Sequence, residues 1–409
     1  MGSAGRRLPP PERGNELGWV VEHLQDLVLE PDGAITPSRS YRGGQGSADD
    51  ALAGLDINGY AHRRSTVLPV ERRGATGLSP YVRHGLLSLP QLWDHVADAS
   101  ASDRRRFRDE LLWQEYARHV YARIGRRSSR PLRHEPATGG NWDEPWPRDM
   151  ACMDLTVGAL EDDGWLVNQT RMWMASQWTV RAGAPFTDGE DRFYRHLLDG
   201  SRAANRLGWQ WTIGSATGKP YGFSRWQVEK RAPGLCATCA LRDDCPIQRW
   251  PDAETGRRIE EPAALRHDPD PAATGGPTEV VRDGTPDAVW LTAESLGDDD
   301  PALAARPDLP AVFVFDEPLL ARLLLSGKRL CFLAETLADL TARRPVEVWL
   351  GRPAEVLADR KVATTFAPVP GWRRLARLVR PVEVHPWPWL VRPHGDSARS
   401  YTAWRKSTN

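Results

Sequence analysis

Apolar residues recur every three or four positions through most of residues 49–250. The pattern is clearest in residues 86–96, LLSLPQLWDHV, and in residues 107–116, FRDELLWQEY. This spacing places the apolar side chains on one face of a helix, where they can pack against a core. We therefore predict that residues 46–250 form a mostly α-helical domain.

The pattern changes after residue 286. Short apolar runs at Ala288–Leu291, Ala311–Phe315 and Val346–Leu350 are rich in β-branched and aromatic residues, and stretches with helical spacing separate them. Buried strands that alternate with helices are typical of a parallel α/β sheet. We predict a small, shortened α/β domain, Rossmann-like with a parallel sheet, over residues 287–409.

Two further segments have the composition of connections. Residues 251–286 are dense in Pro, Gly, Asp and Ala, as in HDPDPAATGGPTEVVRDGTP, which is typical of a linker. Residues 1–45 are rich in Pro, Gly and Arg around one short amphipathic stretch, residues 19–29. We interpret residues 1–45 as an N-terminal arm.

Composition excludes several classes of protein. The chain has 409 residues, of which 40% are hydrophobic and 26% charged, as in a globular protein with an ample core. No apolar run approaches the roughly 18 residues of a membrane span, and the first residues lack the apolar segment of a signal peptide. We expect a soluble, cytoplasmic protein without a membrane partner.

Charge is balanced over the chain as a whole. The 54 basic and 54 acidic residues cancel, which argues against a polyanion binder driven by net charge. Short arginine clusters are nevertheless able to form a local patch for DNA phosphates, and solvated surface charge is the equal alternative for each cluster. These clusters are Arg63-Arg64, Arg72-Arg73, Arg104-Arg105-Arg106, and Arg126-Arg127 with Arg130.

Tryptophan is unusually abundant. The 18 Trp outnumber the 8 Tyr and the 8 Phe, although an indole is large and its N–H needs a partner when it is buried. The excess indicates that the protein uses indole rings.

Four ordered segments resemble one family. Residues 198–211, LDGSRAANRLGWQW, closely resemble the flavin-binding signature of the photolyase and cryptochrome family. Residues 78–81, 110–115 and 164–176 resemble further motifs of that family, in the same order. The resemblance implies a helical domain that binds flavin adenine dinucleotide (FAD).

The order of the domains differs from that of the family. Segments 289–303, 312–316, 328–340 and 351–357 resemble the α/β antenna domain, which normally comes first. The chain therefore resembles a photolyase with permuted domain order, flavin domain first and antenna-like domain last. Because Thr292 and Glu294 replace basic residues of the usual opening motif, we do not expect an antenna chromophore.

The resemblance also assigns flavin-binding residues. Arg171 paired with Asp199 is implied beside the flavin ring, and Asn205 at its N(5) position. The alternative is an ordinary buried ion pair with asparagines as helix caps. Ser201 replaces a second acidic residue of the family, and Gly77 replaces a basic one, which predicts altered flavin binding. The full implied set is Tyr60, Thr76, Leu78, Ser79, Phe107, Asn168, Arg171, Asp199, Ser201 and Asn205.

A substrate site follows from the same resemblance. Family photolyases pass an electron from photoexcited reduced flavin to a pyrimidine dimer flipped out of DNA, and Glu110, Trp113, Met172 and Trp211 match the positions that hold the dimer. Asn168 and Met172 resemble the cyclobutane-dimer branch. The alternatives are core indoles at these positions and, for the whole protein, a cryptochrome-like photosensor or redox flavoprotein that repairs no DNA.

The electron-transfer chain of the family is altered. Trp209 matches the tryptophan next to the flavin, but Phe186 occupies the place of the middle tryptophan, and phenylalanine is much harder to oxidise. Trp173 and Trp178 are candidates for a substitute route. The alternative for both is a role in the core.

Three cysteines are closely spaced at the end of the helical domain. Cys236-x2-Cys239-x5-Cys245 resembles the last three ligands of the iron-sulfur loop of base-excision glycosylases, with Glu229 in place of the first ligand. Cys152 is a candidate fourth ligand, and such thiolates suit a 4Fe-4S cluster or Zn. The alternative is a set of reduced surface thiols.

Overall fold

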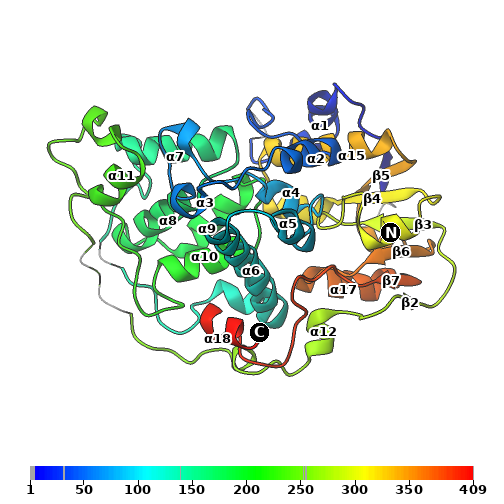
Figure 1. Ribbon diagram of the computed structural model, residues 1–409. Coiled ribbons are helices and arrows are strands. Elements are labelled where there is room, and N and C mark those ends of the chain that lie inside the picture. The colour runs from blue at the N-terminus through cyan, green and yellow to red at the C-terminus, as the bar shows by residue number, and fades with distance from the viewer. Residues whose placement is uncertain (1–4, 31–32, 139, 252, 254–255, 409) are drawn as a thin grey trace. The chain divides into compact units, whose positions relative to one another are not determined.

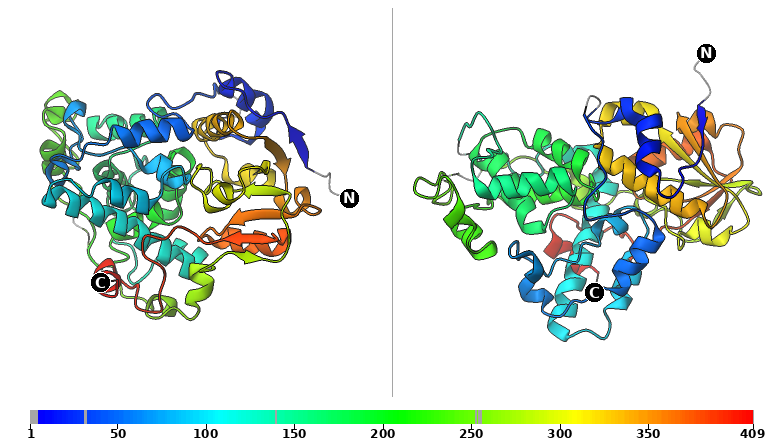
Figure 2. Two further views of the ribbon diagram at one scale, coloured as in Figure 1. Left: turned by 45° about the vertical axis from the view of Figure 1, so that its right-hand side comes forward. Right: turned by 90° about the horizontal axis from the view of Figure 1, so that it is seen from above.

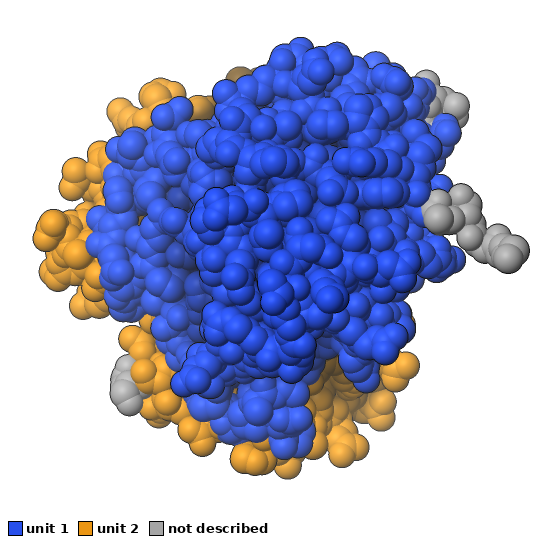
Figure 3. All heavy atoms as spheres, turned by 90° about the vertical axis from the view of Figure 1, so that its right-hand side faces the viewer, with its two compact units in different colours: residues 1–55, 78–95, 269–395 blue, residues 56–77, 96–268, 396–409 orange. Residues whose placement is uncertain are grey.

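A computed structural model describes residues 5–30, 33–138, 140–251, 253 and 256–408 (Figure 1). They form two compact units, each assembled from three segments (Figure 3). Unit 1 comprises residues 1–55, 78–95 and 269–395, and unit 2 comprises residues 56–77, 96–268 and 396–409. No helix in the described part of the chain is long and apolar enough to cross a bilayer.

Unit 1 is built on a sheet of seven strands in the order β1-β5-β4-β3-β6-β7-β2. Five of them run parallel: β3 (Ala288–Leu291), β4 (Ala311–Asp316), β5 (Val346–Gly351), β6 (Val362–Thr365) and β7 (Glu383–His385). The predicted strands within residues 288–350 are confirmed. Their apolar runs reflect burial, because β3 and almost all of β4 are covered on both faces of the sheet.

Both edges of this sheet are antiparallel. Strand β1 (Arg6–Leu8) pairs with β5, and β2 (Val281–Arg282) pairs with β7. The expectation of a purely parallel sheet was therefore wrong at the edges, and the sheet is mixed. Antiparallel pairing requires no crossover helix, so a segment of two or three residues from a distant part of the chain can pair there.

Short helices surround this sheet. Helices α1 and α15 lie side by side (Figure 2), and Trp372 of α17 packs on the sheet beside Trp290 and Phe366. The helices of unit 1 are α1 (Glu16–Leu24), α2 (Gln45–Ala53), α4 (Ser79–Arg83), α5 (Leu89–His95), α12 (Pro271–Gly275), α13 (Pro301–Ala305), α14 (Glu317–Leu323), α15 (Gly327–Thr341), α16 (Pro353–Val356) and α17 (Pro370–Val379).

The segment before α2 is fastened to α15 through its backbone. Gly43 N–H donates to Glu335 Oε2 (2.6 Å) and Gly44 N–H to Thr336 Oγ1 (3.0 Å). A Cβ at Gly43 would lie 2.1 Å from the carbonyl oxygen of Phe332, so glycine permits this close approach. Burial raises the pKa of Glu335 to about 7, while the Gly43 hydrogen bond opposes that rise.

Unit 2 is helical, as predicted for most of its residues. Its longest helix, α6 (Ala101–Ile124), begins at Ser100, whose side chain accepts from the N–H of Asp103. The others are α3 (Tyr60–Arg63), α7 (Ala151–Asp162), α8 (Asn168–Ala175), α9 (Phe186–His196), α10 (Ala204–Thr212), α11 (Arg225–Arg231) and α18 (Tyr401–Lys406). A π-helical turn, Ser176–Arg181, continues α8.

Large aromatic residues form the core of unit 2. Trp146, Trp173, Phe193 and Trp209 are all at most 2% exposed and belong to one apolar cluster with Met153. Each indole removes a large apolar area from water, which explains part of the tryptophan excess. The remaining question is which indoles do more than pack.

Candidate functional site

A glycine turn brings the predicted ion pair together. Gly164 ends α7 in a left-handed conformation (φ 66°), and its carbonyl oxygen accepts from Leu198 N–H (2.8 Å). This bond joins the turn before α8 to the turn after α9. Arg171 of α8 therefore lies opposite Asp199.

Arg171 and Asp199 form a two-pronged contact. Arg171 Nη1 lies 3.1 Å from Asp199 Oδ1, and Arg171 Nη2 lies 2.8 Å from Asp199 Oδ2. Arg171 Nε–H donates to the carbonyl oxygen of Leu166 (3.0 Å). The side chains are only 16% and 7% exposed, so the geometry is both bidentate and shielded from water. The predicted pair exists, and its role toward a flavin stays a prediction.

Asn205 lies in the first turn of α10, with 9% exposure. Its Oδ1 accepts from the N–H of Ser201 (2.6 Å), and Ser201 Oγ accepts from the N–H of Ala203 (3.1 Å). Ser201 thus shapes the turn before α10. The bond to Oδ1 orients the amide so that Nδ2 is the donor that Asn205 can offer to another group.

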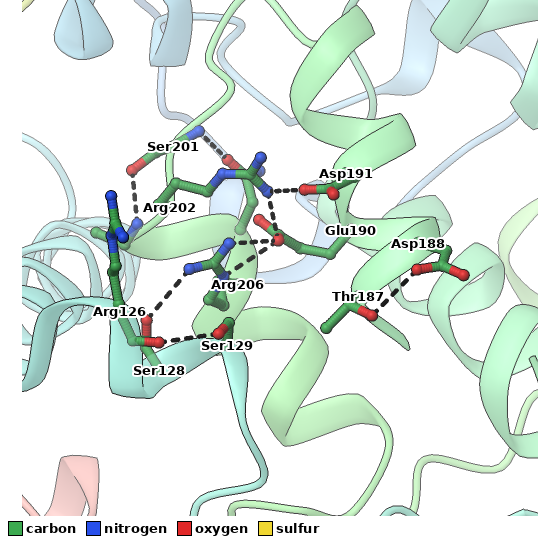
Figure 4. Close-up of polar contacts among 12 residues, drawn as sticks. Arg126, Ser128, Ser129, Thr187, Asp188, Glu190, Asp191, Ser201, Arg202 and Arg206 are labelled. Carbon is green, nitrogen blue, oxygen red and sulfur yellow. Dashed lines mark hydrogen bonds and ion pairs between the residues drawn. The ribbon is translucent and has the colours of Figure 1, made fainter. Parts of the chain in front are cut away.

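A polar network fastens α10 to α9 (Figure 4). Glu190 is 1% exposed, and its Oε2 accepts from Arg202 Nη1 (2.5 Å) and from Arg206 Nη2 (2.8 Å) and Nε (3.1 Å). Arg202 also pairs with Asp191 (2.6 Å), and Arg206 donates to Ser128 Oγ (3.4 Å). Because Asn205 and Trp209 are also on α10, this network helps to hold them in place.

The sequence contained an overlooked signal for this network. Glu190 stands between Phe186 and Phe193 at helical spacing, so a carboxylate occupies the apolar face of α9. A carboxylate at such a position needs cationic partners, and Arg202, in the turn before α10, and Arg206, on α10, both reach it.

Helices α3 and α6 bring together three other predicted residues. The rings of Tyr60 and Phe107 meet edge to face, with centroids 5.3 Å apart. Glu110 Oε1 pairs with Arg64 Nη1 at 2.8 Å. Burial raises the pKa of Glu110, and the charges of Arg64 and Arg106 oppose that rise.

The two predicted substrate indoles have different surroundings. Trp211 is 40% exposed, with its ring 6.2 Å from that of Tyr221, and Met172 is partly exposed. Trp113 is half-buried and contacts Tyr401 of α18 edge to face at 5.4 Å. Tyr401 in turn donates its hydroxyl to Asp109 Oδ1 (2.5 Å). Helix α18 therefore covers part of Trp113.

The remaining predicted flavin residues lie on different elements. Thr76 belongs to unit 2 and is partly exposed, whereas Leu78 and Ser79 belong to unit 1, at the start of α4. Asn168 is the first residue of α8 and is exposed. The role of Thr76, Leu78 and Ser79 in holding phosphates, and that of Asn168 beside the flavin ring, stay predictions.

The three predicted electron-transfer residues also differ. Trp209 is 2% exposed beside Phe193, and its Nε1–H is buried without a hydrogen-bond partner among the described residues. Trp173 is fully buried and stacks on Phe223, with centroids 5.6 Å apart. Trp178 lies on the π-helical turn and is partly exposed.

The four predicted cysteine ligands line one cavity, together with apolar residues and with Arg225 and Arg242. Cys152 comes from α7, and Cys236, Cys239 and Cys245 follow α11. All four carry free thiols. Burial raises the pKa of Cys152 to about 12, and the three neighbouring thiols add to that rise. Within the described ranges, no three or more His, Cys, Asp or Glu side chains are gathered closely enough to hold a metal ion.

Comparison with known proteins identifies the helical part. Residues 107–231 match the family described as the FAD binding domain of DNA photolyase. A deoxyribodipyrimidine photo-lyase of Thermus thermophilus is 30% identical over 231 residues, which cover 51% of this chain and 49% of that protein. One of Synechococcus sp. is 29% identical over 199 residues, covering 43% and 39%. The chain thus spans about half the length of these relatives or less.

Two solved structures, of a cryptochrome and of a photolyase, are similar over comparable lengths. A cryptochrome of Synechocystis sp. PCC6803 is 18% identical, with a TM-score of 0.41 over 48% of this chain and 44% of that one. A bacterial class III photolyase of Agrobacterium tumefaciens is 22% identical, with a TM-score of 0.39 over 54% and 46%. Residues 107–231 thus match the FAD binding domain of DNA photolyase, and about half of the chain is similar in sequence to a deoxyribodipyrimidine photo-lyase.

Proposed function

We propose that the protein binds FAD and uses blue light to split cyclobutane pyrimidine dimers in DNA. The observation that carries this proposal is the Arg171–Asp199 contact, formed inside the segment that matches the FAD-binding domain. The names of the curated relatives, deoxyribodipyrimidine photo-lyases, support dimer-containing DNA as the substrate.

The residues around this contact fit a flavin. When bound, reduced FAD supplies the electron that cleaves the dimer after light absorption. Arg171 offers a positive charge to the ring, held in place by Asp199. Asn205 offers its amide nitrogen, and the buried N–H of Trp209 has no hydrogen-bond partner among the described residues. An unsatisfied buried donor such as that of Trp209 favours a ligand nearby.

Glu110 and Trp211 fit the substrate. Burial raises the pKa of Glu110, which favours the protonated carboxyl, the form that would donate a hydrogen bond to a base carbonyl. The exposed indole of Trp211 can stack on a flipped-out base. Trp113 would also contact the substrate after α18 moves away from it, or through a contact surface that includes Tyr401.

The test uses the full chain reconstituted with FAD and reduced chemically without oxygen. An oligonucleotide with one thymine dimer is illuminated with blue light or kept dark, and restored thymines are quantified by chromatography. We expect repair only in the light. Flavin binding and photoreduction without any repair or dimer affinity would contradict the proposal and support a photosensor or redox flavoprotein.

A matched pair of variants tests the assigned surface. Trp211→Ala should weaken binding of the dimer about tenfold, since one base–aromatic stack is lost. Trp226→Ala removes another exposed indole, 53% exposed on α11, and should leave the affinity unchanged. Equal losses for both variants would remove Trp211 from the substrate site.

We further propose that Cys152, Cys236, Cys239 and Cys245 close around a 4Fe-4S cluster or a zinc ion when it binds, since in this structure they line one cavity but are not gathered closely enough to hold it. The four cysteines line a single cavity, although Cys152 is far from the other three in the sequence. The fold has therefore brought the four thiols together, which supports a shared metal site. Arg225 and Arg242, which line the same cavity, would offset the negative charge of the thiolates. The bound group would cross-link α7 to the loop after α11.

Elemental analysis tests the cysteine proposal. Anaerobically purified protein is assayed for iron, acid-labile sulfide and zinc, and Cys152→Ser should lose the metal. Cys331→Ser, a buried cysteine of unit 1, is the matched control and should keep it. A metal-free wild-type protein that is fully folded would end the proposal.

A further inference from the structure

Two indoles of unit 2 approach each other across a glycine. A methyl group at Gly189, on α9, would lie 2.4 Å from Trp209 Cη2 and 2.8 Å from Trp178 Cγ. Both rings therefore pack against the bare Cα of Gly189. Glycine inside a helix costs about 0.5–1 kcal/mol relative to alanine, and here it allows this approach.

Exposure differs between these two indoles. Trp209 is 2% exposed within the core, whereas Trp178 is partly exposed and donates its Nε1–H to the carbonyl oxygen of Pro185 (2.9 Å). An electron donor in solution can therefore reach Trp178 but not Trp209. The pair connects the surface of unit 2 with its interior.

A third indole, Trp146, also touches Trp178, with centroids 4.6 Å apart. The guanidinium of Arg192 lies over Trp146, with Cζ 5.0 Å from the ring centroid. A cation over an indole stabilises the electrons of the ring, so it makes oxidation of Trp146 less favourable. A positive charge that reaches this pair is therefore expected to stay on Trp178.

We propose that Trp178 and Trp209 form a two-membered route that carries electrons to the bound flavin and bypasses Phe186. This inference rests on the proposed FAD binding. One electron leaves Trp209 for the oxidised, light-excited flavin, and one electron from Trp178 then refills Trp209. The positive charge ends on Trp178, and a thiol in solution returns one electron to it, releases its proton to water and becomes a thiyl radical.

The geometry also favours Trp178 over Trp173, the other residue that the sequence offered for the route. Trp173 is fully buried and stacks on Phe223, so it has no direct access to a donor in solution. Phe186 is 6% exposed at the start of α9, and the proposed route does not use it because Trp178 and Trp209 both lie against Gly189.

The test compares three conservative variants in the presence of FAD and a thiol. Trp178→Phe should lower the rate of flavin photoreduction about tenfold or more, because the charge on Trp209 then recombines with the flavin. Trp173→Phe, the competing route, and Trp226→Phe, a surface control, should leave the rate within about twofold of wild type. Transient absorption should show a long-lived tryptophan radical in every protein except Trp178→Phe. Unchanged photoreduction in Trp178→Phe would overturn the route.

A second readout needs no flavin. The FAD-free protein is exposed to an external one-electron photo-oxidant, and oxidised tryptophans are located by mass spectrometry. Trp178 should be oxidised before Trp146 and Trp209, and preferential oxidation of Trp146 would contradict the proposal. The absorbance of bound flavin separates the two failures: a chain that binds no flavin refutes the proposed function, whereas flavin-loaded Trp178→Phe that behaves as wild type refutes only the route.

Discussion

The proposed flavin side of unit 2, at Arg171 and Asp199, and its proposed substrate side, at Trp113 and Trp211, are prepared to different degrees. On the flavin side, Arg171 and Asp199 already meet in a shielded, bidentate contact. On the substrate side, Trp113 packs against Tyr401 of α18 and only Trp211 is well exposed. A charged contact can be preorganised without its ligand, because each charge satisfies the other. An indole near the surface has no such fixed partner and packs against whichever aromatic ring is adjacent.

The largest expected effect comes from removing the carboxylate that pairs with Arg171. Asp199→Asn leaves the Arg171 guanidinium in a shielded site without its counter-charge, which should cost about 3–5 kcal/mol in the free energy of unfolding. Bound flavin should be lost with it. Urea denaturation and flavin absorbance measure the two effects.

An exposed ion pair provides the control for this prediction. Arg148 pairs with Asp154 at 2.7 Å, but both side chains are about half exposed, so Arg148→Ala should change stability by less than about 1 kcal/mol. If Asp199→Asn were no more harmful than Arg148→Ala, the contact between Arg171 and Asp199 would be an ordinary surface pair.

An intermediate effect is expected from uncovering the substrate side. Tyr401→Ala removes the ring over Trp113 and the hydrogen bond to Asp109, and it should raise the affinity for dimer-containing DNA about tenfold if α18 is a cover. Fluorescence anisotropy of a labelled oligonucleotide measures this. Tyr401→Phe keeps the ring and should stay near wild type. A fall in affinity for Tyr401→Ala would instead make Tyr401 a part of the DNA surface.

The smallest expected effect concerns the proton on Glu110. Burial raises its pKa in the folded protein, so the protonated form persists to higher pH than in the unfolded chain. Its contribution to stability, and its ability to donate to a base, are complete below the unfolded pKa and are lost as pH rises through the folded pKa. The rate of repair should fall over that range by several fold.

Glu110→Gln provides the control, because the amide can still donate a hydrogen bond but does not titrate. Its repair rate should vary less with pH than that of the wild type. A wild-type rate that is flat through this range, with flavin binding unchanged, would show that the Glu110 proton takes no part.

Much of the site was predictable because its residues stand in strings that local pattern or family resemblance can identify. The Arg171–Asp199 pair was anticipated from such strings, and the contact exists. The network of Glu190 with Arg202 and Arg206 was not anticipated, although a carboxylate on the apolar face of α9 signalled it. Periodicity reports whether a side chain is buried, but not which distant group satisfies it.

The pattern along the chain predicts the strands β3, β4 and β5, because burial imposes an apolar run or an alternation on each of them. The candidate residues for a flavin come from the family resemblance, and their role stays a prediction. The fold was needed to show that residues 6–8 close one edge of the sheet, that α18 covers Trp113, and that Trp178 and Trp209 both lie against Gly189. These contacts join short segments that are distant in the chain. Which of these segments pair depends on the packing of the complete fold, because the absence of one Cβ or the edge of one aromatic ring decides which surfaces fit together.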